Sequence, residues 1–353
     1  MHTAIAIESH IDHIDEEALL RYPHDILDLV GGLLNVTDKG YVTLAHMSIK
    51  DYLLTSKVRD GQATSNFSLS ADHSNAVLFR CCMAYISFAH FREGPSRSSE
   101  DYFLRVKKFP LFRHAAISWP YYYRAATPSE DLRVIAMRLF EEGNRSLFTS
   151  WVQCINADNP FCWDFYPRHA TSLYYAATFG LTNIVEGLIR LRVNLDLPGS
   201  RYGGTALHGA VYRLHTPVVK LLLEAGADIN KADFLKVTPL HTAATLGDID
   251  LIKLLLHFSA DTKATDNVGE SPLEWAIQSG QIQNLNILQG IPANDNCRVQ
   301  VNQTTLWKAS NATIPYFPDT LHKHRSGMES SIVFRVVIGT DVLIEEDLPC
   351  FSS

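Results

Sequence analysis

Histidine and carboxylate side chains near the start of the chain have a spacing that could hold a metal ion. His10, Asp12, His13 and Asp15 can face one side of a helix, and imidazole and carboxylate groups are ligands of Zn²⁺. The same pattern is typical of a solvated helix surface. The catalytic motifs H-E-x-x-H, G-x-S-x-G and G-x-G-x-x-G are absent from the sequence. We therefore predict that the protein is not an enzyme, and we expect neither a metal nor another cofactor.

The composition narrows the range of partners and compartments. The six cysteines are irregularly spaced and include no C-x-x-C pair, so neither a zinc site nor a disulfide framework is expected. The net charge is −7 and no block of lysine or arginine occurs, which argues against direct nucleic-acid binding. No apolar run reaches the roughly 18 residues of a membrane span, and no signal peptide is recognisable. We expect an intracellular protein, cytoplasmic or nuclear, without membrane contact.

The strongest pattern is a repeat. Four segments with similar wording follow one another 34, 33 and 33 residues apart: TSLYYAATFG at Thr171, TALHGAVYRL at Thr205, TPLHTAATLG at Thr238 and SPLEWAIQSG at Ser271. A fixed period of this length is typical of a solenoid, in which each unit buries its apolar face against its neighbours.

The third unit shows how one copy is expected to fold. Thr238 is placed to cap a short helix, with Pro239 in its first turn. His241 is expected to hydrogen-bond within that turn rather than to bind metal or catalyse a reaction. Gly247 should end the helix in a left-handed conformation, and Asp248 should cap the next helix. The predicted apolar stripe of that second helix is Ile249, Ile252, Leu255 and Leu256.

The second unit departs from this plan at its turn. Leu214 stands where glycine is usual, so the turn is predicted to be strained. Thr216 and Pro217 are expected to supply the cap and the first turn of the following helix.

These residues resemble the ankyrin repeat. The wording TPLH-x-AA, a second helix such as VVKLLLEA and the ending GADIN recur at the ankyrin period, over about residues 170–290. The resemblance implies a protein-binding module. Its concave face would consist of hairpin fingertips and the exposed side of the first helix of each unit.

The resemblance places candidate partner-binding residues on this face. Aromatic and arginine side chains there are the types that dominate interface energetics, although some of the rings could instead pad the stack. The fingertip candidates are Arg201, Tyr202, Phe234, Leu235, Asn267 and Val268. The inner-helix candidates are Tyr175, Tyr212, Arg213, Thr245, Trp275 and Gln278.

The half before the repeats has its own organisation. A helix over residues 23–30, a hairpin around Asp38–Gly40 and a helix over residues 46–56 suggest a winged-helix-like unit, whose acidic side chains disfavour DNA binding. Further helices are predicted between residues 128 and 156, and a flexible surface loop over residues 93–101. The tail segment SIVFRVVIGTDVLI has strand character and could pair with NCRVQV or be disordered.

Several segments of this half resemble fungal NACHT–ankyrin, NLR-like proteins. The segments predicted to form the winged-helix-like unit come first, followed by AVLFRCCMAYISF at 76–88 and FPLFRHAAISWPYYYRAA at 109–126. They occur in the same order as in that family, ahead of its repeats. The chain contains no Gly-Lys dipeptide and so lacks the phosphate loop of the family's NTPase. Nucleotide-driven switching is therefore not expected of this chain. It would correspond to the back half of such a receptor.

The predicted fold is mainly α-helical, with four regions. They are a winged-helix-like unit (1–60), a helical bridging region (61–165), about four ankyrin repeats (166–290) and a tail of unknown structure (291–353). The predicted function is noncatalytic protein–protein interaction, as a scaffold or adaptor. The alternatives are a transcriptional coregulator or accessory regulator associated with a fungal biosynthetic gene cluster, and a receptor remnant that acts with a separate NTPase chain.

Overall fold

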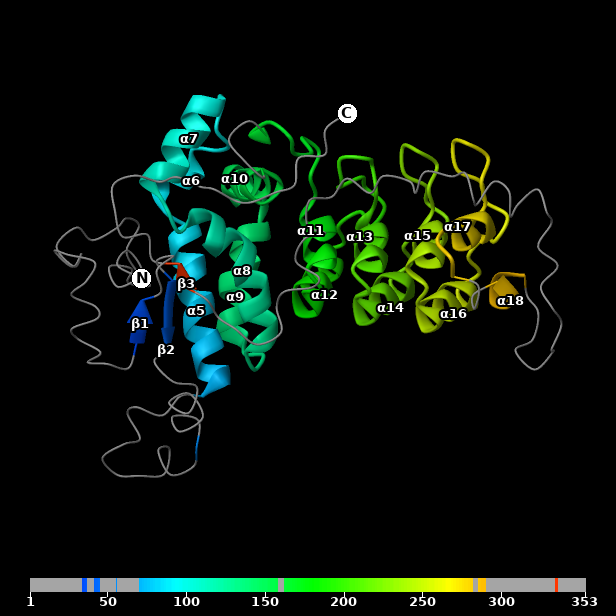
Figure 1. The fold of residues 1–353 in the computed structure, drawn as a ribbon, viewed down its shortest axis with the longest axis horizontal. Helices are drawn as coiled ribbons and strands as arrows, with labels where there is room; N and C mark the ends of the chain where they lie inside the picture. The colour runs from blue at the N-terminus through cyan, green and yellow to red at the C-terminus, as the bar shows by residue number, and fades with distance from the viewer. Residues whose placement is uncertain are drawn as a thin grey trace.

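A computed structural model describes residues 34–36, 41–44, 55, 70–157, 162–281, 285–289 and 334–335. Within these ranges the chain is mainly helical, with a helical bundle followed by a row of helix pairs (Figure 1). The predicted histidine–aspartate cluster, the helix at 23–30 and nearly all of the helix at 46–56 lie outside the described residues.

The predicted N-terminal hairpin is confirmed. Strand β1 (Leu34–Val36) pairs antiparallel with β2 (Tyr41–Leu44), so that Asn35 lies opposite Thr43. The short strand β3 (Phe334–Arg335) pairs with the other side of β2. The tail strand thus has a partner that the sequence did not predict, because strand propensity says nothing of which strand pairs with which. The winged-helix assignment itself stays a prediction.

The bundle begins with four helices: α5 (Ala71–Ile86), α6 (Ala89–Arg92), α7 (Ser99–Lys108) and α8 (Phe112–Ala125). Helices α5 and α8 lie side by side because aromatic residues of each interlock. The ring centroid of Phe79 lies 6.1 Å from that of Trp119 and 5.3 Å from that of Tyr123. Both segments singled out at 76–88 and 109–126 therefore serve as core-forming helices.

The predicted bridging helices are confirmed as α9 (Glu130–Phe140) and α10 (Arg145–Asn156), with a 3₁₀ turn (Glu142–Asn144) between them. Trp151 of α10 is fully buried, and its Nε1 donates to the carbonyl oxygen of Ala116, 2.9 Å away in α8. The same ring packs 5.5 Å from that of Tyr175 in the first repeat. One hydrophobic core therefore runs from the bundle into the repeats.

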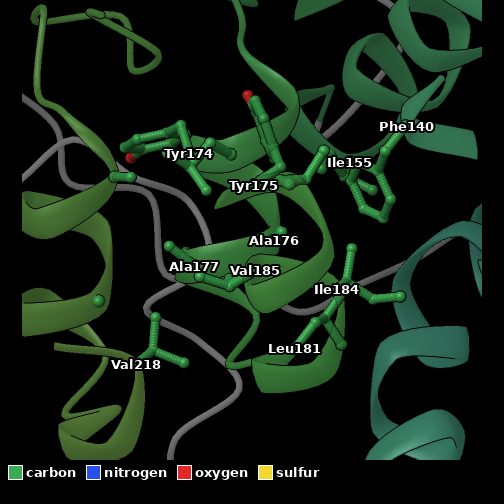
Figure 2. Packing of buried hydrophobic residues seen from close by; sticks show 14 of the residues in the cluster. Phe140, Ile155, Tyr174, Tyr175, Ala176, Ala177, Leu181, Ile184, Val185 and Val218 are labelled. Atoms are coloured by element: carbon green, nitrogen blue, oxygen red, sulfur yellow. The ribbon is translucent and has the colours of Figure 1, made fainter. Parts of the chain in front are cut away.

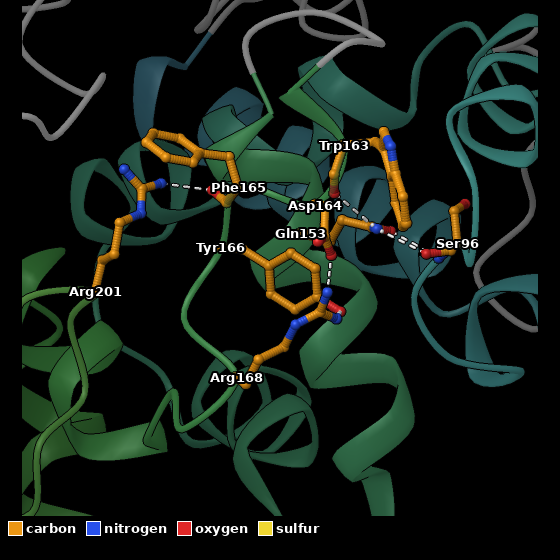
Figure 3. A network of polar contacts seen from close by, with 8 residues as sticks. All are labelled: Ser96, Gln153, Trp163, Asp164, Phe165, Tyr166, Arg168 and Arg201. Atoms are coloured by element: carbon orange, nitrogen blue, oxygen red, sulfur yellow. Dashed lines mark hydrogen bonds and ion pairs between the residues drawn. The ribbon is translucent and has the colours of Figure 1, made fainter.

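The loop predicted at 93–101 is confirmed for residues 93–98, but its last three residues are helical and buried hydrogen bonds anchor the loop at Ser96. Ser99–Lys108 is helix α7, capped by Ser98, whose Oγ accepts from the backbone N–H of Asp101. Ser96 is buried, and its backbone N–H and carbonyl oxygen both bond to the side-chain amide of Gln153, at 2.7 and 3.0 Å (Figure 3). A polar, glycine-containing composition indicates a loop, but a buried amide 57 residues away holds this one in place.

The repeat region is a row of antiparallel helix pairs, as predicted for a solenoid of about four units (Figure 1). The inner helices are α11 (Ser172–Thr178), α13 (Ala206–Tyr212), α15 (Pro239–Leu246) and α17 (Pro272–Gln278). The outer helices are α12 (Thr182–Arg190), α14 (Thr216–Glu224), α16 (Ile249–His257) and the short α18 (Leu285–Leu288).

Small and branched residues alternate in the packed interior of the row. In the first repeat, Ala176 and Ala177 are fully buried beside Leu181, Ile184 and Val185 (Figure 2). Because alanine adds only a methyl group, adjacent inner helices can approach closely.

The predicted stripe of α16 needs one correction. Ile252 and Leu255 are fully buried, but so is Leu251, which was not predicted, whereas Ile249 and Leu256 are half-buried. A nine-residue helix buries more than one narrow line of side chains, because it packs against both the inner helix α15 and the outer helix α18.

The turns confirm the predicted glycine positions. Gly247 adopts a φ of 77°, and Leu214, which replaces the equivalent glycine, adopts a φ of 58°. The predicted cap at Thr216 is wrong by one residue, since α14 begins at Thr216 and His215 precedes it in the N-cap position. Pro217 lies in the first turn as predicted.

Candidate binding face

Hairpin turns precede each inner helix, and we call them fingers. Finger 1 comprises residues 162–170, finger 2 residues 198–204, finger 3 residues 231–237 and finger 4 residues 264–270. They rise together above the inner helices (Figure 1).

Aspartate side-chain oxygens inside fingers 3 and 4 fix the shape of these two turns. Oδ1 of Asp233 accepts the backbone N–H groups of Leu235 and Val237, at 2.8 and 2.9 Å. Asp266 does the same for Val268 and Glu270 in finger 4. These bonds satisfy the turn's own backbone, so the fingers are ordered without help from a partner.

The repeated histidine has the structural role that the sequence predicted. Nδ1 of His241 accepts the N–H of Thr238 at 3.2 Å, and its Nε2 lies 3.1 Å from the carbonyl oxygen of Glu270 in finger 4. Because a carbonyl oxygen only accepts, Nε2 carries the proton and the ring is neutral. His208 repeats the arrangement between Thr205 and Val237. Each histidine therefore links its own helix cap to the base of the next finger.

Backbone bonds join neighbouring fingers. The N–H of Phe234 donates to the carbonyl oxygen of Tyr202, and the N–H of Asn267 donates to that of Leu235, both at 2.9 Å. Fingers 2, 3 and 4 thus form a continuous hydrogen-bonded row. These backbone bonds hold their tips in register.

Side chains make the corresponding link between fingers 1 and 2. The guanidinium carbon of Arg201 lies 3.2 Å from the ring centroid of Phe165, and its Nη2 donates to the carbonyl oxygen of Phe165 at 2.5 Å (Figure 3). His169 Nε2 lies 2.6 Å from the carbonyl oxygen of Ser200. Finger 1 was not predicted from the sequence, although the dipeptide Asp164-Phe165 resembles Asp233-Phe234 and could have indicated it.

The fingertips expose large apolar side chains. Phe234 is 66% exposed, Leu235 41% and Val268 75%, and Phe165 of finger 1 is 47% exposed. Asn267 is also exposed, while Arg201 and Tyr202 are half-buried. Solvent reaches all six predicted fingertip residues, and the apolar ones lie at neighbouring tips.

The inner helices contribute a half-exposed, mainly polar floor. Tyr212, Arg213, Thr245 and Gln278 are all half-buried. The guanidinium carbon of Arg213 lies 5.5 Å from the ring centroid of Tyr212. Nε2 of Gln278 donates to Oε1 of Glu270 in finger 4 at 2.6 Å.

Two predicted surface rings are buried, which corrects their assignment to the face. Trp275 is only 5% exposed, because its Nε1 donates to Oδ2 of Asp266 at 3.0 Å and its ring packs against His241. Tyr175 is only 3% exposed and packs against Trp151. The aromatic type at these positions is compatible with either location, and only the neighbouring side chains decide which one is occupied.

Two further features of the described residues concern metal ligands and membrane-spanning helices. Among them, no group of three or more histidine, cysteine or acidic side chains is placed to hold a metal ion. Within the same ranges, no helix has both the length and the apolar character that a membrane crossing requires. Burial raises the pKa of the Cys82 and Cys154 thiols to about 12, so neither is a ready nucleophile.

Comparisons with known proteins agree with the repeat architecture. The model of the family "Ankyrin repeats (3 copies)" matches residues 136–233 and 231–301. The match and the stacked helix pairs together show that the row from α11 to α18 is an ankyrin-repeat solenoid. The matched range begins in α9, ahead of the first unit recognised in the sequence.

Three relatives illustrate how far the similarity extends. The "Azaphilone pigments biosynthesis cluster protein L" of Monascus ruber is 24% identical over 238 residues, which are 62% of this chain and 49% of that protein. Diacylglycerol kinase iota of Homo sapiens is 37% identical over 86 residues, 24% of this chain and 8% of the kinase. Protein phosphatase 1 regulatory subunit 12A of Mus musculus is 48% identical over 52 residues, 15% of this chain and 5% of that subunit.

The chain spans about half the length of the Monascus protein and much smaller shares of the other two. The Monascus alignment is longer than the range that the ankyrin model matches, so it includes residues outside the repeats. The shorter alignments to the kinase and to the phosphatase subunit leave most of those two proteins unmatched.

Proposed function

We propose that this ankyrin-repeat protein is a noncatalytic interaction module that binds a protein partner on the fingers and on the exposed side of the inner helices. The observation that carries the proposal is the exposure of Phe234, Leu235 and Val268 at neighbouring fingertips. Contiguous exposed apolar side chains in an otherwise ordinary surface are typical of interaction sites. The proposed contact residues are Arg201, Tyr202, Tyr212, Arg213, Phe234, Leu235, Thr245 and Gln278. Trp275 is left out because it is buried.

The fingertips are also preorganised, which supports the same proposal. A Cβ added to Gly203 would come within 2.5 Å of the Phe234 ring, so this ring lies directly on the finger 2 backbone. His169 also packs against the ring, with centroids 5.9 Å apart. Side chains already fixed in place lose little conformational entropy on binding, and this favours affinity.

A double substitution tests the proposed face. Proteins captured by the full chain would be identified by mass spectrometry and compared with those captured by Tyr202→Ala/Phe234→Ala. We expect this variant to lose specific partners, because two central contacts are removed. The matched control is Val134→Ala/Leu191→Ala, which removes exposed apolar side chains from outside the fingers. An unchanged partner list for the fingertip variant would refute the face.

A second candidate function is that of an accessory regulator or transcriptional coregulator linked to a biosynthetic gene cluster. It is supported by the name of the Monascus relative, which describes that protein as a cluster protein. Deletion of the gene should then change transcript or product levels of neighbouring biosynthetic genes. For the coregulator form, exclusion of a tagged chain from the nucleus would be contrary evidence.

The NLR-like origin supplies a third, more specific form of the proposal, in which the chain acts with a nucleotide-binding protein. It is supported by the order of sequence segments ahead of the repeats. Co-purification of the tagged chain from its source cells should recover a protein with a phosphate loop. An in-frame phosphate loop upstream of the coding sequence would instead place the NTPase in the same chain.

A further inference from the structure

Lys236 has a left-handed backbone conformation at a fingertip position that glycine occupies in fingers 2 and 4. The equivalent positions of fingers 2, 3 and 4 are Gly203 with a φ of 81°, Lys236 with a φ of 60° and Gly269 with a φ of 85°. A side chain in this left-handed region strains the backbone, because Cβ crowds the following carbonyl oxygen. The conformation of Lys236 therefore lowers the stability of the folded state.

Strain alone does not single out Lys236. Arg192, Leu214 and Ser259 also have positive φ, at 55°, 58° and 65°, and these lie in the turns that follow helices. Lys236 differs in its surroundings, because it is exposed at a fingertip directly after the exposed pair Phe234 and Leu235. A strained residue at a candidate binding surface is an observation from which a functional role can be argued.

The charges of finger 3 favour an anionic contact. Its carboxylate, Asp233, is turned inward to accept two backbone N–H groups, and burial raises its pKa. Lys231 and Lys236 are both exposed, and neither makes an ion pair with any of the described residues. By contrast, Lys220 and Lys253 on the outer helices lie 3.7 and 4.0 Å from Glu224 and Asp250. The lysines of the outer helices thus lie beside carboxylates, whereas the two lysines of finger 3 are exposed without a carboxylate partner among the described residues.

We propose that Lys236 is a specificity-determining residue, whose ammonium group binds a carboxylate in an acidic segment of the partner protein while an apolar side chain of that segment packs on Phe234. This inference rests on the proposed function and names the partner's chemistry. The adjoining apolar pair favours a protein segment over a nucleic acid, which would need a broad basic surface. The chain as a whole carries a net charge of −7, so a basic, apolar tip would discriminate sharply among partners.

The test uses two fluorescein-labelled peptides and fluorescence anisotropy. Both peptides have a central leucine–phenylalanine pair, flanked by glutamates in one and by glutamines in the other. A labelled oligothymidylate serves as a phosphate-bearing probe. We expect the full chain to bind the glutamate peptide preferentially and to lose affinity as salt is added, because the contact is ionic.

Two variants isolate the lysine. Lys236→Gly should leave the melting temperature unchanged or higher, because glycine relieves the left-handed strain, yet weaken binding of the glutamate peptide about threefold. Lys231→Glu/Lys236→Glu should weaken it about tenfold or more, since repulsion replaces attraction. The matched control Lys220→Glu/Lys253→Glu makes the same change in net charge on the outer helices and should bind as the wild type does.

The remaining outcomes each overturn the inference. They are equal affinity for both peptides, equal losses in the control and fingertip variants, stronger binding of the oligothymidylate, and no binding of the glutamate peptide. Phe234→Ser separates this inference from the proposed function. If it weakens both peptides equally while Lys236→Gly changes neither, the binding face stands and its acidic specificity fails.

Discussion

At the scale of single residues, backbone conformation explains much of the repeat's wording. Each turn after an outer helix needs a left-handed residue, which is Arg192, Gly226 or Ser259 in successive repeats. Glycine adopts this conformation without strain, whereas in other residues Cβ crowds the following carbonyl oxygen and destabilises the fold. The left-handed residue predicted from the sequence, Gly247, follows an inner helix and is confirmed, whereas the turns after the outer helices were not predicted.

A pair of exchanges measures this effect. Gly226→Ala should lower the free energy of unfolding by about 1 kcal/mol, because its φ is 90° and its added Cβ meets no atom within 4 Å, so backbone strain alone acts. Ser259→Gly at the equivalent turn should leave stability equal or slightly raised. Urea denaturation of both variants checks the pair. A neutral Gly226→Ala would contradict the strain argument.

The histidines can also be tested as residues. Burial lowers the pKa of His208 to about 4 and lowers that of His241, so the folded state disfavours protonation. A depressed histidine pKa means that its stabilising effect is complete above the ordinary value near 6.5 and is lost as the pH falls toward 4. Stability should therefore drop over this window by about 2–3 kcal/mol for His208.

The measurement is urea denaturation at pH 7 and pH 4.5. His208→Gln should be less stable than the wild type at pH 7, because the link from the cap to Val237 is weakened, but it should lose less on acidification. An identical pH dependence in the two proteins would show that other groups dominate the acid response.

At the scale of elements, the fingers show where sequence reasoning succeeds and where it stops. The repeat period located fingers 2 to 4, because every copy needs a turn at the same place. Finger 1 was missed, since it precedes the first recognisable helix and its link to finger 2 uses the side chains of Arg201 and His169. A sequence repeat reveals a link that the backbone makes in every copy. It does not reveal a link that particular side chains make in one copy only.

The link between fingers 1 and 2 is open to substitution. Arg201→Met keeps an unbranched apolar stem but removes the stacked guanidinium and its bond to Phe165. We expect increased hydrogen exchange at the backbone amides of finger 1, with little change in fingers 3 and 4, whose own backbone bonds remain. Arg168→Met is the control, because Arg168 stacks on Tyr166 within finger 1 itself. Uniform exchange across all fingers would contradict the local link.

At the scale of the whole molecule, Trp151 joins the bundle to the repeats. Its ring is fully buried and contacts Trp119 and Phe140 on one side and Tyr175 and Phe179 on the other. The continuous core implies that the bundle and the repeats unfold together.

Trp151→Ala should separate the two parts. The substitution should destabilise the chain by about 3–5 kcal/mol, because it removes a large buried ring and leaves a cavity. Differential scanning calorimetry should show one main transition for the wild type and two for the variant. Phe165→Ala, which removes a half-exposed ring, should retain the wild-type profile. A single shifted transition for Trp151→Ala would mean that other contacts suffice to couple the two parts.

The repeat period, the caps at Thr238 and Asp248, the left-handed Gly247 and the N-terminal hairpin could be predicted from the sequence, because they depend on interactions between residues close in the chain. Which aromatic residues face the solvent could be read only from the folded chain. Trp275 and Phe234 are both large and apolar, yet a carboxylate and a histidine ring enclose the first, while the second packs on Gly203 and beside His169 and is still 66% exposed. Such exposure depends on neighbours about 30 residues away, and residue type alone does not report it.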